Sequence, residues 1–448
     1  VNLTTRLSAS FEGDPVVLYE SLRAAQGGGY HACIVTDAFA VVSASPELFF
    51  EKRGRRIRTR PMKGTRPRGR FSEEDASLAA ELKASPKDRA ENLMIVDLLR
   101  NDLGRIATVG TVEVTSLYDV ESYRTVHQLT STIEAELRDG VSLTDVFTAL
   151  FPCGSVTGAP KISTMQVISE LEDGARGLYC GALGVLAPGG DAVFNVAIRT
   201  VSIDRETRHA VYGTGAGITY DSDAAAEYAE IAAKTAVLLE AWPGFELLET
   251  MRVETTGIVR IERHIARLLE SAGYFGFAVD EAVVRAALAD IRVPAPARLR
   301  LLVNEHGSVR TDVLPLTAAV APVVAWARAA VSSGDRFLFH KTTHRRAYDS
   351  RMIEGCWDVL LWNERGVVTE FTRGNVVAEI DGQLLTPLRS CGLLAGTFRA
   401  ELLAAGVVRE RVITRADIAR ASRVWLINSV REWVELSPRH LSNPPIPQ

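Results

Sequence analysis

The tripeptide Trp242-Pro243-Gly244 constrains the fold of this chain most strongly, because it interrupts the helical pattern and divides the sequence into two halves. Proline cannot continue a helix and glycine favours turns, so the stretch indicates a junction between domains. A chain of 448 residues, 47% of them hydrophobic, is expected to form two or three domains with ample cores. Each half is long enough to fold around a core of its own.

Composition narrows the class of protein. The 51 basic and 55 acidic residues nearly balance, so we expect no nucleic-acid partner, and no apolar run reaches the roughly 18 residues of a membrane span. The chain begins at Val1 without methionine, directly in a strand-like run, so we expect the start of the first domain to be missing. The cysteines are scattered without a CxxC pair, which argues against a disulfide framework or a zinc site and for a reducing cytoplasm. They are Cys33, Cys153, Cys180, Cys356 and Cys391.

Lys63 is the first candidate for chemistry. Pro61 and Gly64 predict a tight turn around it, and arginines flank it on both sides. Like charges lower the pKa of a lysine, so more of it is the neutral, nucleophilic amine. A basic surface loop is the alternative for this stretch taken alone.

Glu47 precedes one of three short strands predicted over residues 32–35, 39–43 and 48–50. An acid at such a position can be aimed at a cleft. An acid in a surface turn is the alternative, and the local sequence favours it.

Two predicted helices carry acids three and four residues apart, on one face each. One begins at the N-cap Ser85 and ends at Gly104, and the other begins near Asp221-Ser222-Asp223. A solvated face is the simpler interpretation of the second helix, but two such helices can also give carboxylates to Mg²⁺. The charged residues on these faces are Asp88, Glu91, Glu227, Glu230 and Lys234.

Glycine-rich stretches lie between the two helices. Residues 151–161 open a helix, and Gly213-Thr214-Gly215-Ala216-Gly217 are expected to form a turn before the second acidic helix. Such turns offer backbone N–H groups to anions. A predicted strand over residues 193–199 ends on Arg199, whose guanidinium suits a carboxylate, although a surface arginine is the commoner case. This half therefore suits a small dicarboxylate with a leaving hydroxyl.

Several motifs of the first half, in order, resemble the chorismate-utilising enzymes, a family that includes anthranilate, isochorismate, salicylate and aminodeoxychorismate synthases. The resemblance covers residues 1 to about 240. Lysine in the P-x-K-G-T motif is similar to the aminodeoxychorismate synthases, whereas anthranilate synthases carry alanine there. The motifs are Pro61-Met62-Lys63-Gly64-Thr65-Arg66, residues 88–102, Gly158-Ala159-Pro160-Lys161 and Glu227-Tyr228-Ala229-Glu230.

This resemblance implies a role for each candidate. Glu91 and Glu230 would bind Mg²⁺, with Asp88 and Glu227 behind them through water, and the metal would hold the ring carboxylate of chorismate. Glu47 would be the general acid for loss of the C4 hydroxyl. Lys63 would add at C2 as that group leaves, and ammonia would then attack C4 and expel the lysine.

The resemblance also implies which residues line the chorismate pocket. For His127 a structural hydrogen bond is the alternative. The pocket residues would be Thr65, His127, Ser155, Tyr179, Arg199, Gly215 and Lys234.

The second half has its own lysine. Residues 262–273 predict an amphipathic helix carrying His264 and Arg267, and residues 337–343 predict an apolar strand that contains Lys341. A partly desolvated lysine at a strand end is a candidate for a Schiff base. An edge lysine that reaches into solvent is the alternative, and this strand taken alone favours it. Downstream, Glu370 ends another predicted strand, and residues 392–397 open a helix that can bind phosphate.

These pieces resemble the fold-type-IV enzymes of pyridoxal phosphate (PLP), which include branched-chain and D-amino-acid aminotransferases and aminodeoxychorismate lyases. The resemblance covers about 245–435. It implies Lys341 as Schiff-base lysine and Glu370 at the pyridine nitrogen. Arg267, Gly396 and Thr397 would hold the phosphate, and residues 428–429 would border the pocket. The motifs leave transaminase and lyase open, because both share this cradle.

The two resemblances imply an α+β chain: a chorismate-binding two-sheet α/β sandwich over residues 1–241, followed by a fold-type-IV, branched-chain aminotransferase-like PLP domain over residues 245–448. The fusion favours a bifunctional enzyme of 4-aminobenzoate synthesis, with Mg²⁺ and PLP as cofactors. A separate glutamine amidotransferase subunit would supply ammonia, and a homodimer through the PLP domain stays open. The alternatives are an anthranilate-type or secondary-metabolite enzyme fused to an aminotransferase, and a truncated binding subunit.

Overall fold

The computed structural model describes residues 1–220, 222–239, 242–316, 323–437 and 441. The chain divides into two compact units after Trp242. The first unit comprises residues 1–68 and 76–242, and the second comprises residues 69–75 and 243–448. The membership of residues 69–75 in the second unit was not foreseen from the sequence.

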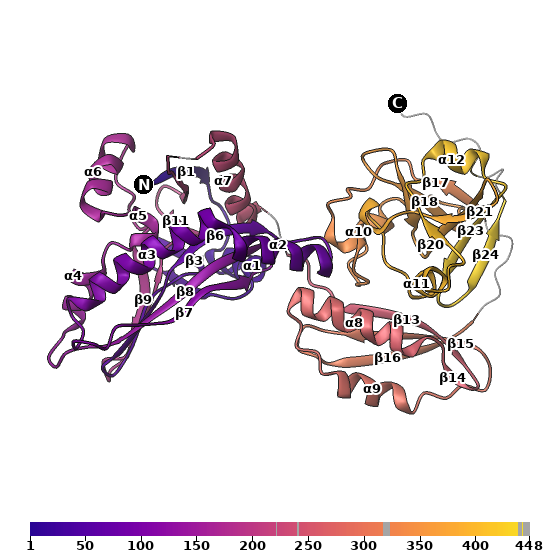
Figure 1. Cartoon of the computed structure of the whole chain (residues 1–448), viewed down its shortest axis with the longest axis horizontal. Helices are drawn as coiled ribbons and strands as arrows, with labels where there is room; N and C mark the ends of the chain where they lie inside the picture. Colours follow the sequence, from indigo (N-terminus) through magenta and orange to yellow (C-terminus); the bar gives the residue numbers. More distant parts are fainter. Residues whose placement is uncertain (221, 240–241, 317–322, 438–440, 442–448) are drawn as a thin grey trace. The chain divides into compact units, whose positions relative to one another are not determined.

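Two antiparallel sheets form the first unit (Figure 1). The first has the order β1 (Asn2–Ser10), β12 (His209–Gly217), β11 (Thr200–Asp204), β3 (Phe39–Ser45) and β2 (Tyr30–Val35). The second has the order β6 (Met62–Pro67), β8 (Val126–Glu136), β5 (Arg56–Arg60), β4 (Leu48–Arg53), β10 (Ala192–Val196) and β9 (Ala182–Leu186), and β7 (Glu113–Ser122) pairs with β8.

The helices of the first unit include α3, which begins at the N-cap predicted from the sequence. Ser85 accepts a hydrogen bond from the backbone N–H of Asp88, and α3 runs to Gly104 as expected. Its buried face packs into the core beside Phe49 and Phe50. The helices are α1 (Pro15–Gln26), α2 (Ser72–Ala84, which begins in the second unit), α3 (Pro86–Gly104), α4 (Leu143–Leu150), α5 (Gly154–Thr157), α6 (Lys161–Leu171) and α7 (Ala224–Leu239). Asp221, named for the start of α7, lies outside the described residues.

Three sheets form the second unit. The first, β14 (Gly257–Ile258), β13 (Leu247–Glu254), β15 (Ala297–Val303) and β16 (Val309–Pro315), packs with α8 (Ile261–Phe275) on β13 and α9 (Glu281–Ala289) on β16. The second joins β17 (Val324–Trp326), β18 (Asp358–Trp362) and β19 (Val368–Phe371). The third has the order β22 (Arg409–Glu410), β21 (Gln383–Thr386), β20 (Asn375–Ile380), β23 (Arg423–Asn428) and β24 (Glu432–Leu436).

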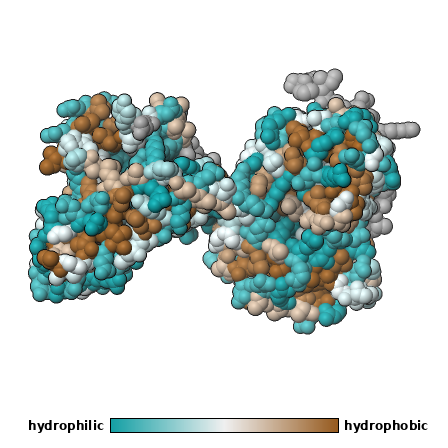
Figure 2. Space-filling view, in the orientation of Figure 1, coloured by the Kyte–Doolittle hydropathy of each residue, from teal (hydrophilic) through white to brown (hydrophobic). Residues whose placement is uncertain are grey.

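Short helices connect the strands of the second unit. They are η1 (Arg336–Leu338), α10 (Arg346–Asp349), η2 (Arg389–Cys391), α11 (Thr397–Ala404) and α12 (Arg415–Arg420). No helix of the described part of the chain is long and apolar enough to cross a membrane. On the face shown in Figure 2, hydrophilic residues separate the hydrophobic areas from one another.

Four local predictions were wrong. Lys63 lies in strand β6 rather than in a turn, and residues 213–217 end strand β12 rather than forming a turn before α7. Lys341 follows the short helix η1 instead of lying in a strand. The predicted strand over residues 193–199 ends at Val196, and Arg199 adopts a left-handed backbone with φ of 49°.

Candidate active sites

The first unit contains a cavity of about 510 Å³ to which almost all the candidate residues of that half contribute. They come from strands of both sheets, from α3, α5 and α7, and from the connecting segments. The candidates that line it are Glu47, Lys63, Thr65, Asp88, Glu91, Ser155, Tyr179, Arg199, Gly215, Glu227, Glu230 and Lys234.

His127 is the exception, since it is not among the residues that line the cavity. Its ring is buried, and Nδ1 lies 2.9 Å from Oγ of Ser122 on the neighbouring strand β7. Alternation along β8 explains this: Val126 and Gln128 line the cavity, so the residue between them points to the other face. The structural hydrogen bond that the sequence left as the alternative is therefore what the structure shows.

Lys63 reaches into this cavity from β6, and its Nζ donates to Oδ1 of Asn2 at 2.7 Å. Burial is the main reason that the pKa of Lys63 is lowered, and the positive charge of Lys234 lowers it further. The flanking arginines are not the cause, because Arg60 pairs with Glu121 and Arg66 pairs with Asp88. The expectation of a lowered pKa agrees with the structure, but its expected origin was wrong.

Glu47 lies almost fully buried at the same cavity. It accepts hydrogen bonds from the hydroxyl of Ser155 and from the backbone N–H of Met62 at 3.4 Å. Burial raises the pKa of Glu47 to about 7. A large share of this carboxyl is therefore protonated near neutral pH, as a general acid requires.

The carboxylates of α3 and α7 face the same space. Burial raises the pKa of Glu91, against the opposing effect of Lys63. Glu230 pairs with Lys234 at 2.6 Å, and one buried oxygen of Glu227, Oε2, has no hydrogen-bond partner among the described residues. No group of three metal-binding side chains occurs in the described chain, but Mg²⁺ commonly takes only one or two carboxylates with water and substrate oxygens. The donor set, hard oxygen ligands with one orphaned atom, fits such an ion.

Glycines of β12 shape one wall of the cavity. A Cβ atom on Gly215 would lie 2.1 Å from the carbonyl oxygen of Leu3, and one on Gly213 would lie 2.2 Å from Cγ of Tyr179. A Cβ on Gly217 would lie 3.0 Å from Nζ of Lys63. These glycines allow close approach of neighbouring groups within a strand, which is why a turn was the wrong prediction.

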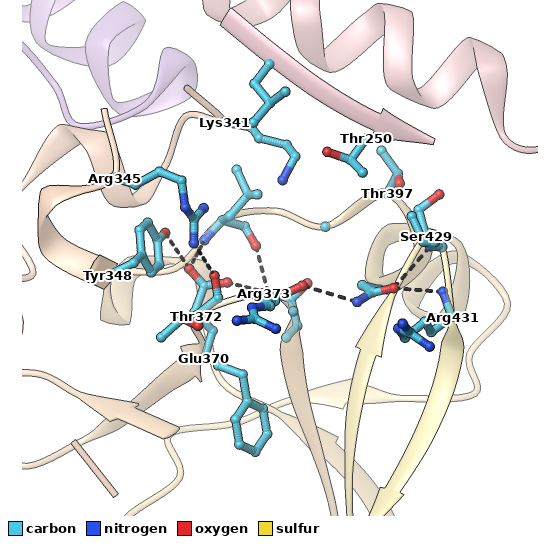
Figure 3. Close-up of a pocket in the computed structure, with 18 of the residues that line it drawn as sticks. Thr250, Lys341, Arg345, Tyr348, Glu370, Thr372, Arg373, Thr397, Ser429 and Arg431 are labelled. Atoms are coloured by element: carbon cyan, nitrogen blue, oxygen red, sulfur yellow. Dashed lines mark hydrogen bonds between the residues drawn. The ribbon is translucent and has the colours of Figure 1, made fainter. Parts of the chain in front are cut away.

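The second unit contains another cavity of about 510 Å³, shown in Figure 3. In Figure 3 the side chain of Lys341 points into it from the side opposite Glu370. Burial is the main reason that the pKa of Lys341 is lowered to about 8, and the charge of Arg267 adds to the effect. The candidates that line this cavity are Arg267, Lys341, Glu370, Gly396, Thr397, Asn428 and Ser429.

Glu370 is held by three donors. Oε1 accepts from the hydroxyl of Tyr348 at 2.8 Å and from the backbone N–H of Leu394 at 3.0 Å. Oε2 accepts from Nδ2 of Asn375 at 3.0 Å. Burial raises the pKa of Glu370 to about 8. A buried acid of this kind favours a positively charged or N–H-bearing partner, which the pyridine nitrogen of PLP provides.

The opposite end of the cavity is built around the start of α11. Gly396 is the N-cap, and a Cβ there would lie 2.1 Å from Oδ1 of Asn375, so only glycine fits. Thr397 and Ser429 bring hydroxyls to this end (Figure 3), and Arg267 brings its guanidinium. Lysine, acid, hydroxyls, guanidinium and helix N-terminus together fit PLP.

Sequence reasoning missed two groups here. Tyr348 supports Glu370, and Glu249 of β13 binds both Arg267 and His264. A signal for Glu249 existed, because it is an acid that directly follows the apolar, buried Leu247 and Leu248 of β13. Tyr348 had no comparable signal.

Both halves of the chain match known family models. Residues 1–240 match the family model of chorismate binding enzymes, and residues 246–437 match that of class IV amino-transferases. Component 1 of the aminodeoxychorismate synthase of Bacillus subtilis is 42% identical over 230 residues, 51% of this chain and 48% of the relative. Component 1 of an anthranilate synthase of Haloarcula marismortui is 42% identical over 240 residues, 54% of this chain and 49% of the relative. The chain spans about half the length of these relatives.

The solved structures similar to the second half include one named an aminotransferase and one named a lyase. An amino-acid aminotransferase from Mesorhizobium loti is 35% identical, with 43% of this chain and 99% of that chain covered and a TM-score of 0.40. A 4-amino-4-deoxychorismate lyase from Pseudomonas aeruginosa is 25% identical, with 43% and 82% covered and a TM-score of 0.38.

The expected α+β fold class, a chorismate-binding domain followed by a class IV amino-transferase domain, is confirmed. The family model of the first domain accounts for more than half of the chain. The protein is thus a member of the chorismate binding enzyme family, and its chain continues into a class IV amino-transferase domain.

Proposed function

We propose that the chain makes 4-aminobenzoate in two steps. The first cavity would convert chorismate and ammonia to 4-amino-4-deoxychorismate, and the second would eliminate pyruvate from that product. The observation that carries the proposal is Lys63: a buried amine of lowered pKa lies in the first cavity, between the general acid Glu47 and the carboxylates of α3 and α7. The fusion to a PLP-type site then supplies an enzyme for the product.

In the first step, the chemistry is divided between Glu47 and Lys63. Glu47, with its pKa of about 7, protonates the departing C4 hydroxyl, which leaves as water. The neutral amine of Lys63 forms a bond to C2 of the ring. Ammonia then bonds to C4, the bond to Lys63 breaks, and the lysine recovers its amine. Glu91 and Glu230 would hold Mg²⁺, whose charge would bind the ring carboxylate, with Asp88 and Glu227 behind them.

In the second step, PLP would supply an electron-withdrawing ring that accepts the electrons released from the substrate. Glu370 would contact the pyridine nitrogen, and its three donors keep its carboxyl group in place. Lys341 would be the base that accepts a proton from the substrate: its pKa of about 8, well below that of an ordinary lysine, leaves part of its amine neutral near neutral pH and more of it neutral toward pH 8. Removal of the ring proton and loss of pyruvate leave the aromatic product.

The proposal includes partners and a compartment. The relatives named component 1 support a separate glutamine amidotransferase subunit as the source of ammonia. A homodimer through the second domain is part of the same proposal, by resemblance to fold-type-IV enzymes. The free cysteines support a reducing, cytoplasmic location.

A second candidate is an anthranilate-type enzyme fused to a class IV aminotransferase. It is favoured by the anthranilate synthase relative, which is as similar as the aminodeoxychorismate synthase. Lys63 argues against it. A chain that only binds, without catalysis, is disfavoured because both cavities retain a buried lysine with lowered pKa.

The decisive experiment is a product assay. The protein is incubated with chorismate, ammonia, Mg²⁺ and PLP, and the products are separated by chromatography. We expect 4-aminobenzoate and pyruvate in equal amounts. Anthranilate would establish the second candidate, and 4-amino-4-deoxychorismate that accumulates without pyruvate would remove the lyase step.

A further inference from the structure

A buried network connects strand β13 to the end of the second cavity at α11. Glu249 accepts from Arg267 through Oε1, at 2.8 Å from Nε, and through Oε2, at 2.5 Å from Nη2. Oε2 also lies 2.6 Å from Nδ1 of His264. The other ring nitrogen of His264, Nε2, lies 2.7 Å from Oγ of Ser429 and 3.3 Å from Oγ1 of Thr397. All of these side chains except Arg267 are more than nine-tenths buried.

The protonation of this network follows from its partners. Arg267 and His264 lower the pKa of Glu249 to about 2 against the effect of burial, so Glu249 is ionised and can only accept. Nδ1 of His264 must therefore carry the proton that lies between the two groups. Burial lowers the pKa of His264, which leaves Nε2 without a proton when the cavity is empty.

An unprotonated Nε2 fixes the hydroxyl of Ser429. Because Nε2 can then only accept, the hydroxyl at 2.7 Å donates its proton to the ring. Ser429 presents lone pairs to the cavity in this state, and lone pairs repel a phosphate oxygen. With neutral His264, this end of the cavity therefore binds an anion weakly.

Protonation of Nε2 reverses this arrangement. Nε2 then donates to Ser429, and the hydroxyl is free to donate to a phosphate oxygen. We propose that His264 takes up one proton from solvent at Nε2 when the cofactor's phosphate binds, and returns it when the phosphate leaves. This inference rests on the proposed PLP site, and it makes His264 and Glu249 positioning residues for the phosphate.

The charge of a bound phosphate would favour this uptake. Arg267 is neutralised by Glu249, with three of its five N–H groups committed to Glu249 and to the carbonyl oxygen of Ala395. Two N–H groups of Arg267 remain for a phosphate dianion, but the neutral Glu249–Arg267 pair has no net positive charge to balance it. Besides Glu249, the charges that act on His264 are Arg267 and Lys341, and both oppose its protonation in the empty cavity. An imidazolium beside the dianion provides the missing positive charge, and Glu249 stabilises it from the other side.

Calorimetry measures the proton directly. The full chain without cofactor is titrated at pH 8 with pyridoxamine 5′-phosphate, which has no aldehyde and so forms no bond to Lys341. The titration is repeated in two buffers of different ionisation heat, and the difference gives the protons taken up. His264→Gln serves as the variant, because its amide N–H can donate to Ser429 but does not titrate. His306→Gln, at an exposed histidine of the same unit, is the matched control.

We expect the unaltered protein and His306→Gln to take up about one proton more than His264→Gln on binding pyridoxamine 5′-phosphate. Their affinity for this ligand should fall about tenfold for each unit that the pH rises, between the pKa of His264 in the free protein and its pKa in the complex. Equal proton numbers in His264→Gln and the unaltered protein would overturn the inference.

A ligand pair provides a second test that needs no variant. Pyridoxamine, which lacks the phosphate, should bind the unaltered protein with about one proton less uptake than its 5′-phosphate. Equal uptake for the two ligands would also overturn the inference. No binding of pyridoxamine 5′-phosphate at all would instead remove the proposed PLP site.

Discussion

The two cavities each hold a buried lysine, but the charges around the lysines differ. Burial lowers the pKa of both Lys63 and Lys341. The next contribution at Lys63 is Lys234, and carboxylates of α3 and α7 partly offset it. At Lys341 the next contribution is Arg267, and the acids are fewer. Burial thus favours the neutral form of the amine in either setting.

The charged residues that line each cavity indicate which kind of ligand it can bind. Acids and bases are mixed in the first cavity, which suits an anionic substrate held together with a cation. Arginines predominate in the second, which suits an anionic cofactor and substrate without a metal. The acids of the first cavity are Glu47, Asp88, Glu91, Glu227 and Glu230, and its bases are Lys63, Arg66, Lys87, Arg199 and Lys234. The charged residues of the second are Arg267, Arg298, Arg300, Lys341, Arg345, Asp349, Glu370, Arg373 and Arg431.

Substitution of each lysine by alanine should have the largest effect and should separate the activities of the two cavities. We expect Lys63→Ala to lower formation of 4-amino-4-deoxychorismate by about 10²–10⁴-fold and to leave its conversion to 4-aminobenzoate unchanged. Lys341→Ala should do the opposite and abolish the absorption band of bound PLP. Each variant is assayed with chorismate and, separately, with supplied 4-amino-4-deoxychorismate. Loss of both steps in either variant would show that the lysines do not serve separate sites.

Removal of metal should separate the two cavities next. Chelation of Mg²⁺ is expected to slow the first step by about a hundredfold or more, since a bound cation contributes several kcal/mol, and to leave the second step unaffected. Glu91→Gln should require a higher Mg²⁺ concentration for the first step. Asp349→Asn is the matched control, because it removes a carboxylate from the cavity without a predicted metal. A first step indifferent to chelation would contradict the assignment of the carboxylates.

The pH dependence of the two steps should differ in sign. The first step needs protonated Glu47, whose pKa is about 7, and neutral Lys63, so its rate should fall about tenfold per pH unit above the pKa values of both groups when free NH₃ is held constant. The second step needs neutral Lys341, whose pKa is about 8, so its rate should rise toward pH 8. Glu47→Gln should remove the falling limb of the first profile. A falling limb that persists in this variant would assign it to another group.

The smallest expected effect concerns Tyr348. Tyr348→Phe removes one of the three donors to Glu370, a loss of about 1 kcal/mol, or about fivefold in PLP affinity. Fluorescence titration of the apoprotein with PLP measures it, and chorismate binding in the first cavity should not change. An unchanged PLP affinity would show that the remaining donors hold Glu370 without Tyr348.

The sequence predicted the parts of the sites whose signals are local. The cap at Ser85, the spacing on α3 and α7, and the motifs around Lys63 and Glu370 each lie within a few residues. These features depend on neighbours in the chain, so a sequence pattern can reveal them.

Predictions failed where distant segments decide the structure. The apolar run around Phe337 resembles a strand, but its ring packs against Phe245 and Phe275, and the backbone turns into η1. Glycines 213–217 resemble a turn, but contacts with Leu3 and Tyr179 explain their composition. A pairing such as Glu249 with Arg267, 18 residues apart, becomes visible only when β13 and α8 are packed together.

The glycines of β12 also bear on attempts to change what the first cavity accepts. Even a methyl group at Gly213 or Gly215 would collide with backbone or with a packed ring. The shape of this wall is therefore set by the main chain and cannot be altered by substitution of these glycines. Diversification of the binding site has to come from walls built of side chains, such as those that bear Thr65 and Ile198. Variants with side chains at Gly213 or Gly215 are therefore expected to fold poorly, whereas variants of the facing side chains should leave the strand intact.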